Sequence, residues 1–266
     1  MPTLPAPGSE PHRERQAAES FGADPERYDR TRPRYPAPLV DRIVTAGPGP
    51  DVLDVGIGTG IAARQLRAAG CRVLGVEVDP RMAAFARRGG FDVEVSAFET
   101  WDPAGRTFDA VVSAQTWHWI DPAAGAAKAA GALRPGGLLA VFWNVAQPPP
   151  ALSDAFGEVY ARVLPHLPAL GAAMSALDAY APLFAKATDG IRATGALTEP
   201  EQWRFTWEQA YTRDEWLDQV PTIGGHSRFR PAELDALLAG VGAAIDAAGG
   251  GFTMAYTTVA VTATRA

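Results

Sequence analysis

The chain has 266 residues, with 24 Lys and Arg against 30 Asp and Glu, so its formal net charge is −6. Hydrophobic residues make up 47% and charged residues 20%, which is typical of a soluble globular protein with a sizeable core. The acidic balance disfavours a dedicated nucleic-acid-binding protein. The single cysteine, Cys71, excludes an intramolecular disulfide and a zinc site built from several thiolates.

The N-terminal region predicts a tail and a lid rather than a targeting or membrane segment. Its first residues contain no apolar run of signal-peptide length, and no stretch of the chain approaches the roughly 20 apolar residues that span a bilayer. We therefore expect a cytoplasmic protein with no membrane partner. Within residues 1–36, the polar and Pro-rich stretch 1–10 predicts disorder, 10–21 suits a helix, and 28–36 (YDRTRPRYP) holds too many prolines for regular structure.

Short apolar strands alternate with helices in residues 37–145. Helices are predicted to begin near Pro38 and Pro80 and to cover 61–69 and 122–133. Strands are predicted at 51–55, 72–78, 93–96, 108–114 and 138–143. This alternation indicates stacked βαβ units. The fold predicted is therefore a Rossmann-like, doubly wound α/β fold with helices on both faces of a mostly parallel sheet.

The pattern changes after Asn144. Residues 146–200 contain prolines and two helical patterns, at 152–164 and 174–186, which predict a helical insertion that caps the substrate side of the sheet. Residues 201–266 resume the earlier character and are expected to complete a seven-stranded core. Their predicted strands are 202–211 and 251–264, and their predicted helices are 213–220 and 231–248.

The sequence Asp54-Val-Gly-Ile-Gly-Thr-Gly60 follows the first predicted strand and opens a helix. Glycines here let the backbone turn tightly and approach a ligand. A dinucleotide fingerprint would place its third glycine at Ile61, and the Asp54 carboxylate would attract an ammonium group but repel a pyrophosphate. Glu77 ends the second strand 21 residues after Gly56, where its carboxylate can accept hydrogen bonds from both ribose hydroxyls. An ammonium group, a ribose and an adenine together describe S-adenosylmethionine (SAM).

Two alternatives for these carboxylates need no ligand. Asp54 could cap the following helix, as Asp often does. Glu77 could be a solvated carboxylate at a strand end. Three glycines alone are shared by many nucleotide sites, so the loop by itself does not fix its ligand.

Five segments of the chain occur in a familiar order: VLDVGIGTG, VLGVEVDPRM, Ala97 to Trp101, FDAVVSAQTWHWID and LRPGGLLAVFWN. Over about residues 28–144 the chain resembles the class I SAM-dependent methyltransferases, in particular the small-molecule branch (methyltransferase type 11) with UbiE-like and trans-aconitate methyltransferases. Many relatives carry an Asp where this chain has Ala97, so the contact with the adenine amino group differs and Phe98 could pack on the ring. The resemblance implies a set of cofactor-binding residues: Asp54, Gly56, Gly58 and Gly60 at the methionine end, Glu77 on the ribose, and Val78, Ala97, Phe98 and Ala114 around the adenine side.

Methyl transfer is an in-line displacement at an activated carbon, so positioning of the acceptor can supply much of the catalysis. A general base is needed only for a protonated, weakly acidic acceptor. His118 is the candidate base because its unperturbed pKa lies near neutrality; alternatively it frames the site with its tryptophan neighbours. Asn144 could hydrogen-bond the acceptor or cofactor, or form a plain strand-end turn.

The acceptor side is predicted from the lid and from aromatic residues. Tyr28, Arg32 and Tyr35 resemble a lid over the site, and Arg32 would suit an anionic acceptor. No spacing of His, Asp or Glu suggests a metal site. Trp117, beside His118, is predicted on the acceptor side of the site. Two further aromatic residues either line an acceptor pocket or belong to the core, as aromatic clusters usually do: Trp207 and Tyr211.

We predict an enzyme that transfers a methyl group from SAM to O, N or C of a small-molecule metabolite, with S-adenosylhomocysteine (SAH) as the other product. The alternative keeps the cofactor but catalyses a non-methylating rearrangement or cyclisation, since function depends on the site and not on the fold. A non-catalytic binding module would not need the intact glycine loop and Glu77, and the glycine spacing disfavours a nicotinamide dehydrogenase. The absence of an Asn-Pro-Pro-Tyr motif, in which a flipped base could stack, disfavours nucleic acid as a substrate.

Overall fold

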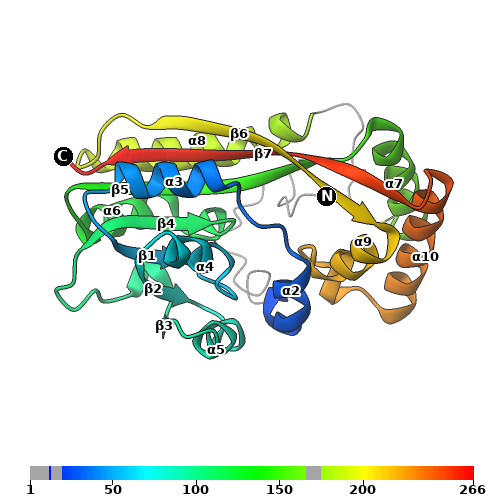
Figure 1. Cartoon of the computed structure of the whole chain (residues 1–266), viewed down its shortest axis with the longest axis horizontal. Helices are drawn as coiled ribbons and strands as arrows, with labels where there is room; N and C mark the ends of the chain where they lie inside the picture. The colour runs from blue at the N-terminus through cyan, green and yellow to red at the C-terminus, as the bar shows by residue number, and fades with distance from the viewer. Residues whose placement is uncertain (1–11, 13–19, 166–174) are drawn as a thin grey trace.

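One sheet organises the residues that the computed structural model describes, which are 12, 20–165 and 175–266. Its seven strands lie in the order β3-β2-β1-β4-β5-β7-β6 (Figure 1). The strands are β1 (Asp51–Val55), β2 (Arg72–Glu77), β3 (Asp92–Val95), β4 (Phe108–Ala114), β5 (Leu133–Gln147), β6 (Glu201–Thr212) and β7 (Gly251–Thr264). Neighbours from β3 to β5 run parallel, whereas β7 is antiparallel to both β5 and β6. The predicted Rossmann-like α/β fold is confirmed, with antiparallel pairing at one edge.

The burial of each strand reflects its place in the sheet. β4 is buried from Phe108 to Ser113, because a parallel strand covered on both faces needs a continuous apolar run. The edge strand β6 instead alternates, with Trp203 and Tyr211 buried among exposed and half-buried residues. The strand order reverses between β1 and β4, and open α/β sheets bind ligands in the crevice at the carboxyl ends of such strands.

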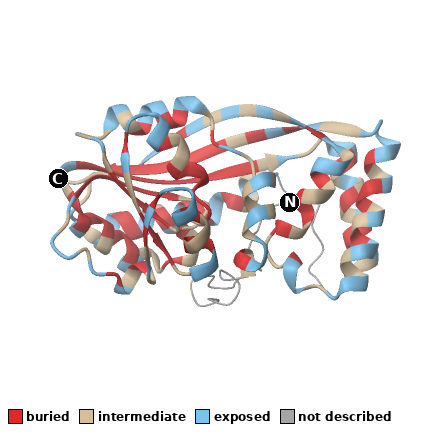
Figure 2. Cartoon of the chain, turned by 60° about the horizontal axis from the view of Figure 1, so that its bottom comes forward, coloured by how far each residue is buried: buried red, intermediate tan, exposed pale blue. Residues whose placement is uncertain are grey.

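Helices cover both faces of the sheet, and alternate residues of each strand point to opposite sides. Val112 of β4 packs with α3 (Ala37–Ala46) and α4 (Ile61–Ala68). Val111 packs on the other side, with α6 (Pro122–Ala132) and α8 (Ala176–Thr194). A further helix, α5 (Pro80–Arg88), packs beside β3. The central strands are accordingly the most continuously buried part of the chain (Figure 2).

Strands β5, β6 and β7 extend beyond the parallel strands and carry a second group of helices, which we call the α7–α9–α10 lobe. It comprises α7 (Pro150–Val163), α9 (Arg213–Gln219) and α10 (Pro231–Ala247), at the right of Figure 1. Residues 146–200, predicted as one helical insertion, are therefore divided. α7 packs in this lobe, whereas α8 packs against α6 and covers the sheet. Helical periodicity shows that a face is apolar but not which element covers it.

The lid is a short helix, α2 (Pro25–Thr31), that lies between the parallel strands and the α7–α9–α10 lobe (Figure 1). Asp24 caps it by accepting a hydrogen bond from the backbone of the first turn. Ion pairs tie it to both sides: Glu26 contacts Arg88 of α5 at 2.5 Å, and Arg30 contacts Asp218 of α9 at 2.8 Å. Such exposed pairs are individually weak, so the lid is held by contacts that are easily exchanged.

Five short 3-10 helices complete the described structure: η2 (Ser20–Ala23), η3 (Phe98–Thr100), η4 (Trp117–Trp119), η5 (Val220–Thr222) and η6 (His226–Arg228). The helix predicted over 10–21 lies mainly outside the described residues. Within those residues, no helix combines the length and apolar character needed to cross a bilayer. The described His, Cys, Asp and Glu side chains form no group of three that could hold a metal ion.

Candidate functional site

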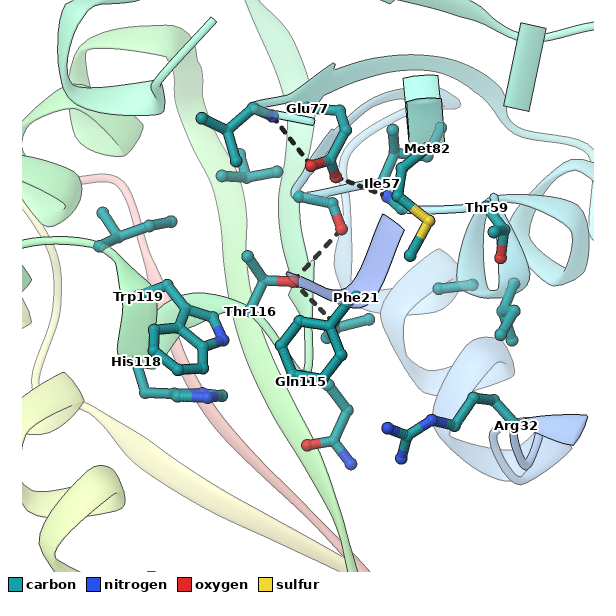
Figure 3. A pocket seen from close by; sticks show the side chains of 18 of the residues that line it. Phe21, Arg32, Ile57, Thr59, Glu77, Met82, Gln115, Thr116, His118 and Trp119 are labelled. Carbon is teal, nitrogen blue, oxygen red and sulfur yellow. Dashed lines mark hydrogen bonds between the residues drawn. The ribbon is translucent and has the colours of Figure 1, made fainter. Parts of the chain in front are cut away.

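A cavity of about 430 Å³ lies at the carboxyl edge of the parallel strands, beneath the lid and beside the α7–α9–α10 lobe (Figure 3). This volume is typical of small-molecule sites. Five residues predicted from the sequence do not line it: Asp54, Gly60, Trp117, Trp207 and Tyr211. The other predicted residues lie on its wall: Tyr28, Arg32, Tyr35, Gly56, Gly58, Glu77, Val78, Ala97, Phe98, Ala114, His118 and Asn144.

The glycine loop forms one wall of the cavity. Gly56 and Gly58 have φ values of +71° and +57°, in the left-handed region that favours glycine. A Cβ on Gly56 would lie 2.2 Å from Cγ2 of Thr116, whereas a Cβ on Gly58 would have only a backbone oxygen at 4.0 Å. Gly60 instead serves as the N-cap of α4, without a side-chain hydrogen bond. The loop is therefore pressed against Thr116 at one glycine and leaves space for a ligand at the next.

Glu77 holds the loop and the turn after β2 in place. Its Oε2 accepts a hydrogen bond from the Gly58 N–H at 2.8 Å, and its Oε1 accepts from the Val78 N–H at 2.9 Å (Figure 3). Oε1 also accepts from the Asp79 N–H at 2.9 Å. Burial raises the pKa of Glu77, and these three hydrogen bonds act in the opposite direction. Because its side chain is only 8% exposed, Glu77 is not a solvated strand-end carboxylate. Oε2, which accepts only one of these bonds, still has a lone pair for a ligand hydroxyl.

Asp54 lies beneath the loop with neither carboxylate oxygen hydrogen-bonded. It is 1% exposed, and burial together with the charge of Glu77 raises its pKa to about 7. Asp54 does not cap α4, so that ligand-free alternative fails. Nearby on the cavity wall, Thr59 Oγ1 is also buried without a partner. Unpartnered buried polar groups are costly, so this pair suits a ligand that is positively charged and donates hydrogen bonds.

Phe98 places an aromatic edge on the cavity wall while its ring packs into the core. Its centroid lies 6.1 Å from Trp101 and 6.3 Å from Trp117. Ala97 precedes it on the same wall and brings no acidic side chain to the cavity. Trp117 is 2% exposed and belongs to the core beneath Phe98. The sequence placed Trp117 on the acceptor side of the site, whereas the structure packs it in the core.

His118 lies on the wall, but its geometry argues against the predicted general base. Trp143 Nε1, which can only donate, lies 3.2 Å from His118 Nδ1. The ring is therefore neutral with its proton on Nε2, and burial lowers its pKa to about 3. Nε2 is buried without a partner. His118 consequently presents an N–H donor and has no free lone pair with which to accept a proton.

Asn144 ties the segment after the lid helix to the antiparallel strands. Its Nδ2 donates to the carbonyl oxygen of Arg34 at 3.1 Å, and its Oδ1 accepts from Thr258 Oγ1 at 2.6 Å. The same Thr258 hydroxyl accepts from Trp207 Nε1 at 2.8 Å. Trp207 stacks on Tyr256, with centroids 4.3 Å apart, and so lies behind the wall. The strand-end turn predicted as an alternative for Asn144 does not occur, because β5 continues to Gln147.

The lid helix and the segment after it contribute two tyrosines and an arginine to the cavity wall: Tyr28, Tyr35 and Arg32. Arg32 lies over the ring of Tyr28, with 4.9 Å from Cζ to the centroid, and donates through Nη2 to the carbonyl oxygen of Thr222. Its Nε is buried without a partner. Tyr35 packs edge-on against Phe142 at 4.8 Å. Arg32 thus reaches the cavity with donor capacity to spare.

The structure adds wall residues that the sequence did not single out. Gln115 and Thr116 directly follow β4, and Gln115 has a φ of +58°, unusual for a residue with a side chain. Their position directly after Ala114, a predicted site residue, could have indicated them from the sequence. From distant elements come Phe21, Tyr180, Trp216, Gln219 and Tyr256. Tyr211 stands behind this group, with its hydroxyl 2.8 Å from that of Tyr256.

Residues 53–141 match the model of a family described as a methyltransferase domain. The chain is 34% identical over 146 residues to an uncharacterised methyltransferase of Mycobacterium tuberculosis, covering 54% of this chain and 59% of the relative. It is 34% identical over 95 residues to a ubiquinone biosynthesis O-methyltransferase of Methylocella silvestris, covering 33% of this chain and 37% of that protein. The matches thus span less than two thirds of these relatives.

Two solved structures share the fold over nearly the whole chain. A proposed type II methyltransferase from Anaeromyxobacter dehalogenans has a TM-score of 0.60 and 19% identity, covering 87% of this chain and 97% of that chain. A structure from work on the conversion of a disulfide bond into a thioacetal group during echinomycin biosynthesis has a TM-score of 0.52 and 19% identity, covering 95% and 91%. At these identities the likeness concerns the fold alone.

Proposed function

We propose that this chain is a class I SAM-dependent methyltransferase that transfers a methyl group from SAM to a small molecule, because residues 53–141 match the model of a methyltransferase domain. The acceptor atom is O, N or C. The cavity is bounded by the glycine loop on one side and by the aromatic lid and lobe on the other. The proposal assigns the loop side to the cofactor and the lid side to the acceptor.

The unpartnered carboxylate of Asp54 is the observation that supports SAM most directly. A buried carboxylate that no donor satisfies is stabilised by a cation, and SAM carries an ammonium group at its methionine end. In this proposal Asp54 attracts that ammonium group and the open side of Gly58 receives the methionine backbone. The lone pair left on Glu77 Oε2 accepts from a ribose hydroxyl.

The adenine is proposed to lie against the wall segments that follow β2 and β3. Val78, Ala97 and Phe98 present apolar surface there, with Ala114 at the end of β4 closing the site. Because no acidic side chain stands at Ala97, the adenine edge is proposed to meet backbone groups. When bound, SAM supplies a methyl carbon activated by the neighbouring sulfonium.

The remaining wall residues of the chain position the acceptor and exclude water. His118 presents Nε2–H as a hydrogen-bond donor, because its Nδ1 is already used by Trp143. Asn144 fixes the segment after the lid helix by its hydrogen bond to Arg34, and it is not assigned a role in proton transfer. Burial raises the pKa of the Tyr180 hydroxyl on the wall, so it is a poor base near neutral pH. These features favour an acceptor that is already nucleophilic, such as a carboxylate, a phenolate or a neutral amine.

Calorimetric titration with SAM, SAH and NADH tests the cofactor assignment. We expect micromolar binding of the two sulfur ligands and none of NADH. Asp54→Ala and Glu77→Ala should each weaken SAH binding by at least about tenfold. Asp92→Ala, which removes an exposed carboxylate from β3, is the matched control and should leave the affinity unchanged. Unaltered SAH affinity in the Asp54 and Glu77 variants would contradict the proposal.

The alternative, a SAM-supported rearrangement or cyclisation, differs in its stoichiometry. Methyl transfer releases one SAH for each product, whereas the alternative leaves SAM unchanged. Incubation with candidate acceptors, followed by mass spectrometry of both the acceptor and SAH, separates the two. A product that forms without SAH would favour the alternative.

A further inference from the structure

Arg32 is an uncompensated positive charge on the cavity wall. Among the described wall residues it is the only Arg or Lys, and no carboxylate of the described part lies within ion-pair distance of it. Its neighbour Arg30, by contrast, is paired with Asp218 at 2.8 Å. A guanidinium with a buried, unpartnered Nε is left with a donor directed at no protein group.

The groups around Arg32 are neutral aromatic hydroxyls. Tyr35, Tyr180 and Tyr256 line the cavity, and the pKa of each is raised by burial even though Arg32 acts to lower it. These hydroxyls therefore stay protonated and do not neutralise the guanidinium. Tyr35 is within electrostatic reach of both Arg32 and Asp54. Figure 3 shows Glu77 and Arg32 on opposite sides of the cavity.

A second unsatisfied group lies on the lobe side of the same cavity. Gln219 is 4% exposed, lines the wall, and has an Oε1 with no hydrogen-bond partner. Trp216 of the same helix and Tyr256 of β7 add aromatic surface beside it. The wall thus offers a cation, a hydrogen-bond acceptor and flat apolar surface, all contributed by the chain outside the glycine loop.

We infer that the acceptor is a small aromatic acid, whose carboxylate binds Arg32, whose ring lies between the aromatic side chains, and whose N–H or O–H donates to Gln219. This inference rests on the proposed function, since it assigns the acceptor of that same cavity. A planar guanidinium matches a carboxylate in geometry as well as in charge. A neutral amide of the same shape fills the same space but leaves the guanidinium unneutralised.

Matched pairs of acids and amides test the inference. The probes are benzoate with benzamide, 4-hydroxybenzoate with 4-hydroxybenzamide, and cinnamate with cinnamamide, each titrated by calorimetry into the protein saturated with SAH. At least one acid should bind about tenfold more tightly than its amide. Arg32→Gln should reduce that preference to less than about twofold, and Arg32→Lys should retain part of it. Arg204→Gln removes an equal charge from an exposed position of β6 that does not line the cavity, and should leave the preference intact.

The possible failures are distinguishable. Saturation with SAH is a prerequisite, so a protein that does not bind SAH fails the proposed function before any acid is added. Normal SAH binding with no acid preferred over its amide in any pair, absence of binding included, overturns the acidic acceptor alone. The same conclusion follows if a preference exists but persists unchanged in Arg32→Gln.

Discussion

The buried carboxylate of Asp54 should make the unliganded protein less stable as the pH rises. Burial and the charge of Glu77 raise its pKa in the folded state to about 7, whereas an unfolded Asp titrates near about 3.9. Between these values the folded state binds a proton that the unfolded state has released. The stabilising contribution is therefore complete below the unfolded pKa and is lost as the pH rises through the folded one.

The size of this effect follows from the separation of the two pKa values. Each pKa unit corresponds to about 1.4 kcal/mol, so the whole contribution is about 4 kcal/mol, of which about 3 kcal/mol disappears between pH 5 and pH 8.5. Asp54→Asn has no ionisation at this position. Its free energy of unfolding should therefore fall by about 3 kcal/mol less than that of the native protein over the same interval.

Urea unfolding at pH 5 and pH 8.5 measures this difference. Comparing the change within each protein cancels the fixed cost of a buried amide without partners, about 1–3 kcal/mol. Asp109→Asn is the control, because Arg134 at 2.7 Å helps to hold the pKa of Asp109 below its usual range. That contribution is lost only as the pH falls into the acid range, so the control should be destabilised equally at both pH values. Equal pH dependence in Asp54→Asn and the native protein would refute the reasoning.

Three further predictions concern the loop, the wall and the lid. Gly56→Ala should lower the free energy of unfolding by about 2–5 kcal/mol, from its left-handed φ and the collision with Thr116, and Gly58→Ala by only about 1–2 kcal/mol; equal losses in urea unfolding would contradict the packing. With its pKa lowered to about 3, His118 stays neutral from pH 5 to pH 9, so His118→Gln should alter turnover without removing an ionisation from the pH–rate profile. Asp218→Asn frees Arg30 and should speed SAH dissociation several-fold in stopped flow while costing at most about 1 kcal/mol of stability; an unchanged dissociation rate would show that α2 does not control access.

The parallel part of the fold was predictable because its signals are local. Burial on both faces produces continuous apolar runs such as the one in β4, and glycine or proline bounds them. β5 was underestimated because Asn144 reads as a strand end. Its polar side chain instead accepts a hydrogen bond from Thr258, 114 residues later in the chain. No local sequence pattern predicts such a distant partner. The same limit applies to α8, whose apolar face covers the sheet rather than a cap.

The two sides of the site differed in how far they could be predicted from the sequence, and the reason is similar. The residues proposed for SAM come from short motifs at strand ends, where one spacing rule fixes several positions. The lobe side is assembled from Tyr180, Trp216, Gln219 and Tyr256, which only tertiary packing brings together. Trp207 shows the difficulty, because its alternation on β6 is clear, yet Tyr256 covers it.

The paired strands β5 and β7 both contribute residues to the cavity wall. Asn144 and Ala146 face the cavity from successive rungs of β5 and pair with Thr258 and Tyr256 of β7. Residues two positions apart on a strand lie about 7 Å apart, which is comparable to the length of an aromatic ring. A larger side chain at position 146 would fill part of the cavity from a position outside the glycine loop. A substitution at position 146 therefore changes the side of the cavity formed by the antiparallel strands and leaves the glycine loop as it is.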